Sequence, residues 1–217
     1  MEATEPRHDV LVVLCRGESR RYGAPKALAT VGDDPRPLLA RVVSLHRQAG
    51  RNRLLVVTTA GLADACAGCL ATVAEVEIVA GPDGGDTALT LALAWDHLAA
   101  TSVAVTHVWA HPVDLPRVGI RTLRQLAAVS AAAPGRLVRP AWDHRPGHPV
   151  VLPAKVLARL APEARDWQGP WRTLLDAAVA SGRCAPPLLV AVADPGTILD
   201  LDTVPPPDGA AGGTRGG

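Results

Sequence analysis

Short apolar segments alternate with helical patterns from residue 8 to residue 133, and this alternation constrains the fold more than any other feature. His8–Cys15 and Arg53–Thr59 are rich in Val and Leu and are bounded by polar residues, as buried strands are. Between them, Pro37–Gly50 carries apolar residues at helical spacing, with Pro at its start and Gly at its end. Strands that alternate with helices predict an α/β fold with a mostly parallel sheet and helices on both faces.

The same periodicities predict the remaining elements. Further helices are expected over 62–73, 87–99, 117–133, 154–160 and 170–181, and further strands over 76–80, 103–110, 188–193 and 197–201. Asp86 is the expected N-cap of the helix over 87–99. Two short extended pieces are expected within 136–152, and the tail over 205–217 is rich in Pro and Gly, which predicts disorder.

Composition excludes several classes of protein. Hydrophobic residues make up 48% of the 217 residues, enough for a large core, and a net charge of +1 argues against partners such as nucleic acid or a membrane surface. No apolar run reaches the roughly 20 residues that span a bilayer, and residues 1–9 are too polar for a secretory signal. Cys66 and Cys69 form a CxxC pair inside an Ala-rich helical pattern without a second pair, which falls short of a zinc motif. We expect a cytoplasmic protein with reduced thiols.

The loop after the first strand, Leu14–Lys26, is the most informative segment. Gly17 and Gly23 let the backbone approach a ligand closely, and amides at the end of a strand can form an anion nest. Arg20, Arg21 and Lys26 add positive charge, and Ser19 adds a hydroxyl. This combination predicts a polyphosphate ligand.

Two standard nucleotide loops are excluded. The Walker pattern GxxxxGK[ST] is absent because Gly23 is followed by Ala24 and Pro25 before Lys26. A dinucleotide fingerprint would need GxGxxG and an acidic residue closing the second strand, which ends here in two threonines.

The loop instead fits the pattern LxxGxSxRxGxPK, met by Leu14, Gly17, Ser19, Arg21, Gly23, Pro25 and Lys26. This resembles the signature loop of the MobA-like NTP transferases, which move a nucleoside monophosphate from an NTP to a phosphorylated acceptor. The resemblance implies a three-layer α/β/α, Rossmann-like nucleotidyltransferase (GT-A-like) fold. It also implies one domain over residues 1–204, with a nucleotide-binding half at about 9–116 and an acceptor-binding half at about 117–204.

The resemblance names candidate nucleotide-binding residues. Cys15 and Arg16 stand where the family usually has two alanines, close to where the base binds. The full set is Leu14, Cys15, Arg16, Gly17, Ser19, Arg21, Lys26 and Thr87. For Thr87, helix capping is an alternative role.

Asp114 follows the fourth expected strand, at the carboxyl edge of the sheet where ligands of open α/β folds collect. A helix N-cap is one role for this carboxylate and a Mg²⁺ ligand is another. The segment HPVDLP resembles the family's metal-binding DxP segment, which favours the metal. His111, in the same segment, is either a strand-end histidine or a ligand.

The segment ILDLDT resembles the family's closing DxDT, so Asp202 or Asp200 is expected to complete the metal site. The two carboxylates share one face of the expected strand, whose solvent-facing edge is the alternative explanation.

Two later segments suggest the acceptor side. His148 lies in a Gly-His-Pro turn like that of MocA-type members, and Arg172 follows Gly-Pro-Trp at the start of a helix. An ordinary turn is the alternative for the first, so both residues are named as candidate acceptor contacts.

The resemblance therefore implies a Mg²⁺-dependent nucleotidyltransferase with Arg21, Lys26 and Asp114 as catalytic residues. The segments around Asp114 and His148 are closer to the molybdopterin cytidylyltransferase branch than to the guanylyl branch. CTP is thus expected before GTP, molybdopterin is the expected acceptor, and a molybdoenzyme or chaperone is a possible partner. A sugar-1-phosphate nucleotidylyltransferase and a non-catalytic nucleotide-binding module are the alternatives.

Overall fold

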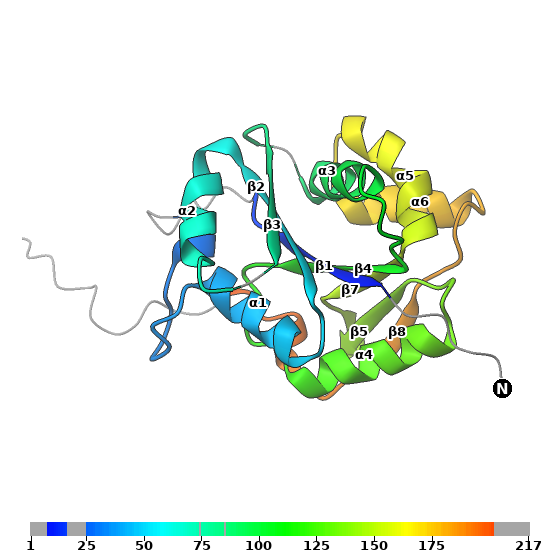
Figure 1. Ribbon diagram of the computed structural model, residues 1–217. Coiled ribbons are helices and arrows are strands. Elements are labelled where there is room, and N and C mark those ends of the chain that lie inside the picture. The colour runs from blue at the N-terminus through cyan, green and yellow to red at the C-terminus, as the bar shows by residue number, and fades with distance from the viewer. Residues whose placement is uncertain (1–7, 17–24, 74, 85, 202–217) are drawn as a thin grey trace, which may run out of the picture.

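In the part of the chain that the structure describes, eight strands form one sheet, and helices cover both of its faces (Figure 1). The computed structural model describes residues 8–16, 25–73, 75–84 and 86–201. The strands are β1 (Asp9–Leu14), β2 (Arg53–Thr59), β3 (Val76–Gly81), β4 (His107–Pro112), β5 (Val138–Trp142), β6 (Arg145–Pro146), β7 (Val150–Pro153) and β8 (Leu188–Ala191). The α-helices are α1 (Leu38–Gln48), α2 (Ala63–Cys69), α3 (Thr87–Ala99), α4 (Ile120–Ala132), α5 (Ala154–Asp166) and α6 (Trp171–Ala180). Short 3₁₀ turns are η1 (Lys26–Leu28), η2 (Ala60–Leu62) and η3 (Pro195–Thr197).

The strand order is β3-β2-β1-β4-β7-β5-β6, with β8 paired to β5. The first four strands in this order are parallel, so their carboxyl ends meet at one edge of the sheet. β7 runs antiparallel to β4 and to β5, and β8 runs parallel to β5. The central residues of both strands, 10–13 of β1 and 54–57 of β2, are fully buried, which explains why these strands lack the alternation of a half-exposed strand.

Two hydrophobic cores lie on opposite faces of the sheet. One packs α3, α5 and α6 against the sheet, and the other packs α1, α2 and α4 against its opposite face (Figure 1). The expected three-layer α/β/α fold with a mostly parallel sheet is therefore confirmed.

Four elements differ clearly from the expectation. α2 ends at Cys69 rather than Val73. β4 begins at His107 rather than Val103, because its partner β1 begins at Asp9, opposite His107. α5 continues past Leu160 to Asp166 despite Pro162, and its inward face remains buried over that extra turn. The strand expected over 197–201 is wrong: Asp194 caps a 3₁₀ turn at Pro195–Thr197, so Asp200 does not lie on the face of a strand.

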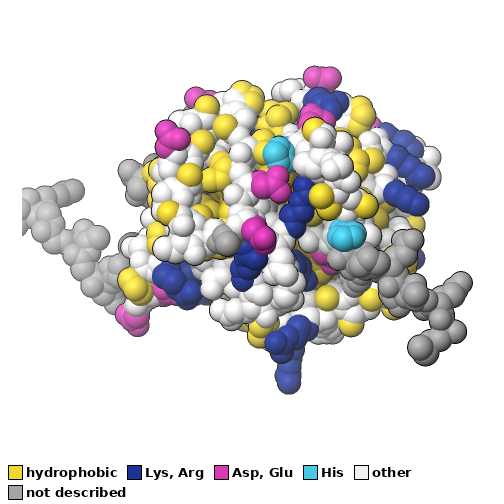
Figure 2. All heavy atoms as spheres, viewed as in Figure 1, with side chains coloured by type: hydrophobic (Ala, Val, Ile, Leu, Met, Phe, Trp, Pro, Cys, Tyr) yellow, Lys and Arg dark blue, Asp and Glu magenta, His cyan; other side chains and the backbone are white. Residues whose placement is uncertain are grey.

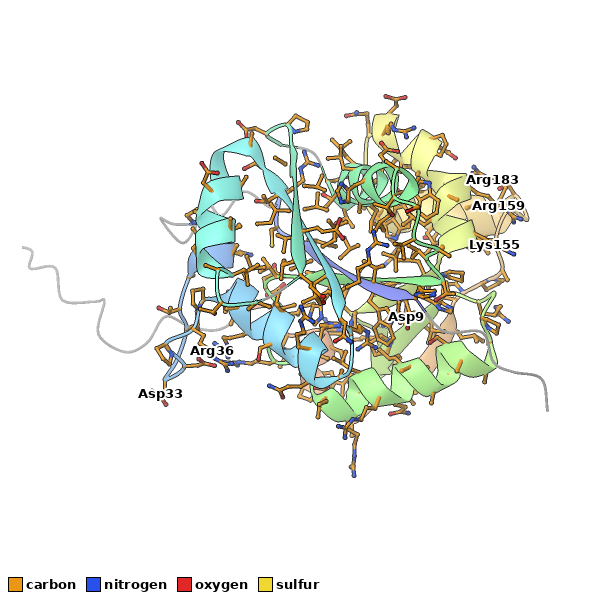
Figure 3. All side chains as sticks on the ribbon, viewed as in Figure 1. Asp9, Asp33, Arg36, Lys155, Arg159 and Arg183 are labelled. Carbon is orange, nitrogen blue, oxygen red and sulfur yellow. The ribbon has the colours of Figure 1, made fainter. Side chains whose placement is uncertain are left out.

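A partly buried polar cluster lies at the amino ends of β1 and β4, opposite the carboxyl edge of the sheet. Asp9, at the amino end of β1 (Figure 3), accepts hydrogen bonds from Thr106, His107 and Trp109.

On the face shown in Figure 2, acidic and basic side chains of the described residues are interspersed. Among the described helices, none combines the length and apolar character needed to cross a bilayer.

Candidate functional site

Two neighbouring cavities lie at the carboxyl edge of the sheet and share the turn that follows β4. The first cavity, of about 270 Å³, is lined by Leu14, Cys15, Arg16, Pro25, Lys26, Ala27, Leu62, Asp86, Thr87, Thr90, Pro112, Val113 and Asp114. The second cavity, of about 350 Å³, is lined by Pro112, Asp114, Leu115, Arg145, Pro146, Gly147, His148, Thr197, Ile198 and Asp200. Asp114 thus contributes to both walls, where a ligand in either cavity can reach it.

Lys26 and Asp114 come together across the first cavity. Lys26 Nζ lies 3.2 Å from Asp114 Oδ2, and the two side chains are 17% and 27% exposed. Lys26 begins η1, directly after the glycine loop, and Asp114 follows β4, so the pair joins the ends of two adjacent parallel strands. An ammonium and a carboxylate held side by side can bind a phosphate and a cation respectively.

Backbone hydrogen bonds fix the turn that carries Asp114. Val113 N donates to Leu14 O at 3.3 Å, and Leu115 N donates to Pro112 O at the same distance. Leu201 N donates to Asp114 O at 3.2 Å and brings the end of the described chain to the site. These backbone contacts fix the position of the turn, and therefore of Asp114, relative to β1.

Arg16 ties the first cavity to the loop after β3. Its Nη2 donates to Pro82 O at 2.6 Å and to Gly84 O, and its Nη1 lies 3.5 Å from Thr90 Oγ1. Burial lowers the pKa of this guanidinium, and Asp86 partly offsets the effect. Since its terminal nitrogens bond to protein oxygens, Arg16 shapes the cavity wall as a tether between β1 and the β3–α3 loop.

The start of α3 presents Thr87 to the first cavity. Asp86 is the N-cap of this helix, as expected: its Oδ1 accepts from Ala88 N at 2.8 Å and from Leu89 N at 3.3 Å. Because Asp86 caps the helix, the Thr87 side chain is not needed for that role.

His148 lies on the wall of the second cavity. Burial lowers the pKa of its imidazole to about 3, and the nearby Arg139 contributes to the shift. Its Nδ1 is buried and has no hydrogen-bond partner among the described residues. The ring is therefore neutral near pH 7 and suits an uncharged contact rather than a phosphate clamp.

Gly147 allows the His148 turn to approach η3. A Cβ at this position would lie 2.6 Å from Thr197 O and 3.0 Å from Ile198 Cγ2. His148 N also donates to Thr197 O at 2.8 Å. The glycine of the Gly-His-Pro turn is thus required by packing, and this contact forms one side of the second cavity.

Arg172 lies apart from both cavities. Its side chain on α6 is 80% exposed and lies 3.8 Å from Asp176, one turn further along the helix.

Cys66 and Cys69 belong to α2, and the cysteines form no disulfide. Among the described residues, no three His, Cys, Asp or Glu side chains are grouped as metal ligands.

Four of the expected site residues, Gly17, Ser19, Arg21 and Asp202, lie outside the described residues. Sequence reasoning missed His46, which is fully buried on the apolar face of α1. Its helical spacing after Leu39, Val42 and Val43 indicates that it faces the core. A histidine buried in the core needs a hydrogen-bond partner, and this requirement could have pointed to a second polar residue nearby. That partner is His111, which is fully buried and lines neither cavity.

Comparisons with known proteins agree with this geometry. Residues 11–194 match the model of the MobA-like NTP transferase domain. The structure is similar to that of Rv0371c from Mycobacterium tuberculosis H37Rv, with 27% identity, a TM-score of 0.67 and coverage of 85% of this chain and 88% of that one. A manganese complex of Rv0371c matches at 25% identity and a TM-score of 0.65, covering 86% and 88% of the two chains. A nucleotidyl transferase from Methanothermobacter thermautotroptrophicus shares the fold at 17% identity, with a TM-score of 0.71 and coverage of 91% and 93%. No curated protein sequence matches.

Proposed function

Because the chain belongs to the MobA-like NTP transferase family, we propose that it moves CMP from CTP to a phosphorylated acceptor and releases pyrophosphate. The acceptor in this proposal is the molybdopterin cofactor. The observation that supports it most strongly is the position of Asp114, which lines both cavities. A reaction that joins two substrates needs such a shared boundary, with one substrate on each side.

The first cavity is the proposed nucleotide site. It contains the end of β1, the residue that follows the glycine loop, and the N-terminus of α3, three features that favour anions. Lys26 would hold the triphosphate as a compact charge with three donors, and Arg21 of the glycine loop is proposed to assist it. Arg16 and Thr87 would form the wall beside the nucleoside, with Arg16 acting through the loop it tethers.

The second cavity is the proposed acceptor site. His148 and Arg145 line it, and Asp114 lies at its boundary with the first cavity. In the proposed reaction an acceptor phosphate oxygen attacks the α-phosphorus, the new P–O bond forms, and the bond to the β-phosphate oxygen breaks as pyrophosphate leaves. The residues of this chain contribute position and charge, since such a transfer requires no covalent bond to the protein.

The residues at the boundary fit a divalent cation. Mg²⁺ is commonly held by one or two carboxylates together with substrate phosphates and water, so a cage made entirely by protein is not needed. Asp114 offers one accessible carboxylate and Asp200 lines the second cavity, while Asp202 is proposed as a further ligand. When bound, the cation would neutralise charge on the departing pyrophosphate. Preference for Mg²⁺, a cytoplasmic location and a molybdoenzyme or chaperone partner belong to the same proposal.

Pyrophosphate release, measured with each of the four NTPs and with Mg²⁺ or Mn²⁺, tests the proposal. We expect release to require molybdopterin and to be fastest with CTP. Lys26→Ala and Asp114→Asn should each lower turnover by about 10²-fold or more, as loss of a charge-stabilising group does. Lys155→Ala is the matched control, because Lys155 is an exposed lysine on α5 (Figure 3). Folded protein that releases no pyrophosphate from any NTP would contradict the proposed activity, and release that depends on a sugar 1-phosphate would contradict the proposed acceptor.

A further inference from the structure

Two fully buried histidines lie behind the turn that carries Asp114. His46 comes from α1 and His111 from β4. His46 Nε2 lies 2.8 Å from His111 Nδ1, and His111 Nε2 lies 2.9 Å from the carbonyl oxygen of Leu115, the residue after Asp114. The histidine pair therefore links α1 to the turn through two consecutive hydrogen bonds.

The chemistry of the acceptor fixes the proton positions in this chain. A carbonyl oxygen can only accept, so His111 Nε2 must carry the proton that faces Leu115 O. A neutral His111 then has a bare Nδ1, which can only accept, so His46 Nε2 must donate to it. His46 Nδ1 is left as a bare acceptor, and it is the buried atom of the pair without a partner among the described residues. An unpaired lone pair there avoids the greater cost of an unpaired buried donor.

The surroundings of His46 hold its ring in place. The ring packs edge-on against Trp109 at 6.1 Å between centroids, and Trp109 Nε1 donates to Asp9. His46 and His111 are themselves packed edge-on at 5.0 Å. His46 is thus a rigid donor that reinforces the His111 tautomer required by the Leu115 carbonyl.

The contact to Leu115 differs in kind from the other contacts of the turn. The bonds at Val113, Asp114 and Leu115 N described above join backbone to backbone. The His111 ring instead supplies a hydrogen bond from a side chain to the backbone of this turn. A substitution can therefore remove it without cutting the chain.

We propose that His46 and His111 are positioning residues for Asp114: His46 stabilises the Nε2-protonated tautomer of His111 by donating to its Nδ1, and His111 holds the Leu115 carbonyl so that the carboxylate stays at the boundary of the two cavities. The inference rests on the proposed role of Asp114 in binding a divalent cation. It assigns a functional reason to two buried polar side chains that lie among the apolar residues of this core.

The test uses pairs of variants of the full chain that differ in one donor. His111→Gln keeps an amide donor near the position of Nε2, whereas His111→Leu removes the donor to the Leu115 carbonyl. In the same way, His46→Gln keeps a donor to His111 Nδ1 and His46→Leu removes it. Mn²⁺ affinity in the presence of CTP, the imidazole ¹⁵N shifts that report the tautomer, and amide exchange at Asp114 and Leu115 are the readouts. His97→Gln, on α3 and paired with Glu77, is the control.

We expect His111→Leu to weaken Mn²⁺ binding about tenfold and to speed exchange at Leu115, with His111→Gln recovering most of both. His46→Leu keeps His111, so it should fold even where His111→Leu fails, and it should give a mixture of His111 tautomers with about threefold weaker binding. Wild-type tautomer, exchange and affinity in His46→Leu would overturn the inference. If Asp114→Ala binds Mn²⁺ as the wild type does, the proposed metal site is wrong. The positioning role of the two histidines is then tested by amide exchange at Asp114 and Leu115. Unchanged exchange rates in His46→Leu would overturn it.

Discussion

The buried histidine pair predicts a loss of stability in mild acid. Burial lowers the pKa of His111 to about 4, and burial together with its neighbour His111 holds the pKa of His46 well below its usual range. In the unfolded chain both rings titrate near pH 6.5. Above pH 6.5 the rings are neutral in both states and do not change the free energy of unfolding. As the pH falls from 6.5 toward 4, the unfolded chain takes up protons that the folded protein refuses, so stability is lost.

The size of the loss at pH 5 follows from these values. That pH lies about 1.5 below the unfolded pKa, and each pH unit is worth about 1.4 kcal/mol per proton, so the His111 ring alone costs about 2 kcal/mol. His46, whose pKa is also held low, acts in the same direction, and the His111 contribution alone is a substantial share of the roughly 5–15 kcal/mol typical of a domain. His148, whose pKa is also lowered, acts in the same direction. The lowered pKa values of Asp34 and Glu77 act at more acidic pH, so they do not enter this window.

Chemical denaturation at pH 7.5 and pH 5.0 measures the effect directly. The difference in the free energy of unfolding should be at least about 2 kcal/mol in the wild type and clearly smaller in His46→Leu, which lacks one titrating ring. Replacing the exposed His144 with Ala provides a control for imidazoles in general. Equal stability at the two pH values, or the same difference in His46→Leu as in the wild type, would refute the reasoning.

Three further predictions concern single contacts. Gly147→Ala should lower stability by about 1–3 kcal/mol in thermal unfolding, because the new Cβ meets the Thr197 carbonyl, whereas Gly68→Ala on α2 has open space and should be neutral or stabilising. Asp194→Ala should cost about 2–4 kcal/mol, since its carboxylate accepts from Gly119 N, Thr122 Oγ1 and Gly196 N; an unchanged denaturation midpoint would show that these bonds contribute little. Arg16→Ala should raise the KM for the nucleotide more than it lowers kcat, because the tether to Pro82 and Gly84 shapes the nucleotide cavity; an unchanged KM would argue against that role.

Local patterns predicted most of the fold because they carry their own physical signal. The apolar run of β1 and the capped helical pattern of α3 are complete within a few residues, and both elements lie where the sequence indicates. The strand expected over 197–201 failed because an apolar run does not reveal whether a partner strand is present. At that point Asp194 and Pro195 start a 3₁₀ turn instead.

The candidate site also has features that local sequence predicts and features that depend on long-range packing. The Lys26 and Asp114 pair was within reach of sequence, since both residues follow strands whose carboxyl ends share an edge. The tether from Arg16 to Pro82 and the contact between His46 and His111 join residues more than 60 positions apart, and neither follows from local spacing. Such contacts depend on how layers pack, which periodicity does not encode.

A crystal structure with Mn²⁺ and a non-reactive CTP analogue tests the central claim most directly, because the anomalous signal of manganese locates the ion independently of the protein. The account predicts a peak within coordination distance of the Asp114 carboxylate, the phosphates beside Lys26, and the base toward Arg16 in the first cavity. A manganese peak away from Asp114, or a triphosphate bound outside the first cavity, would contradict it.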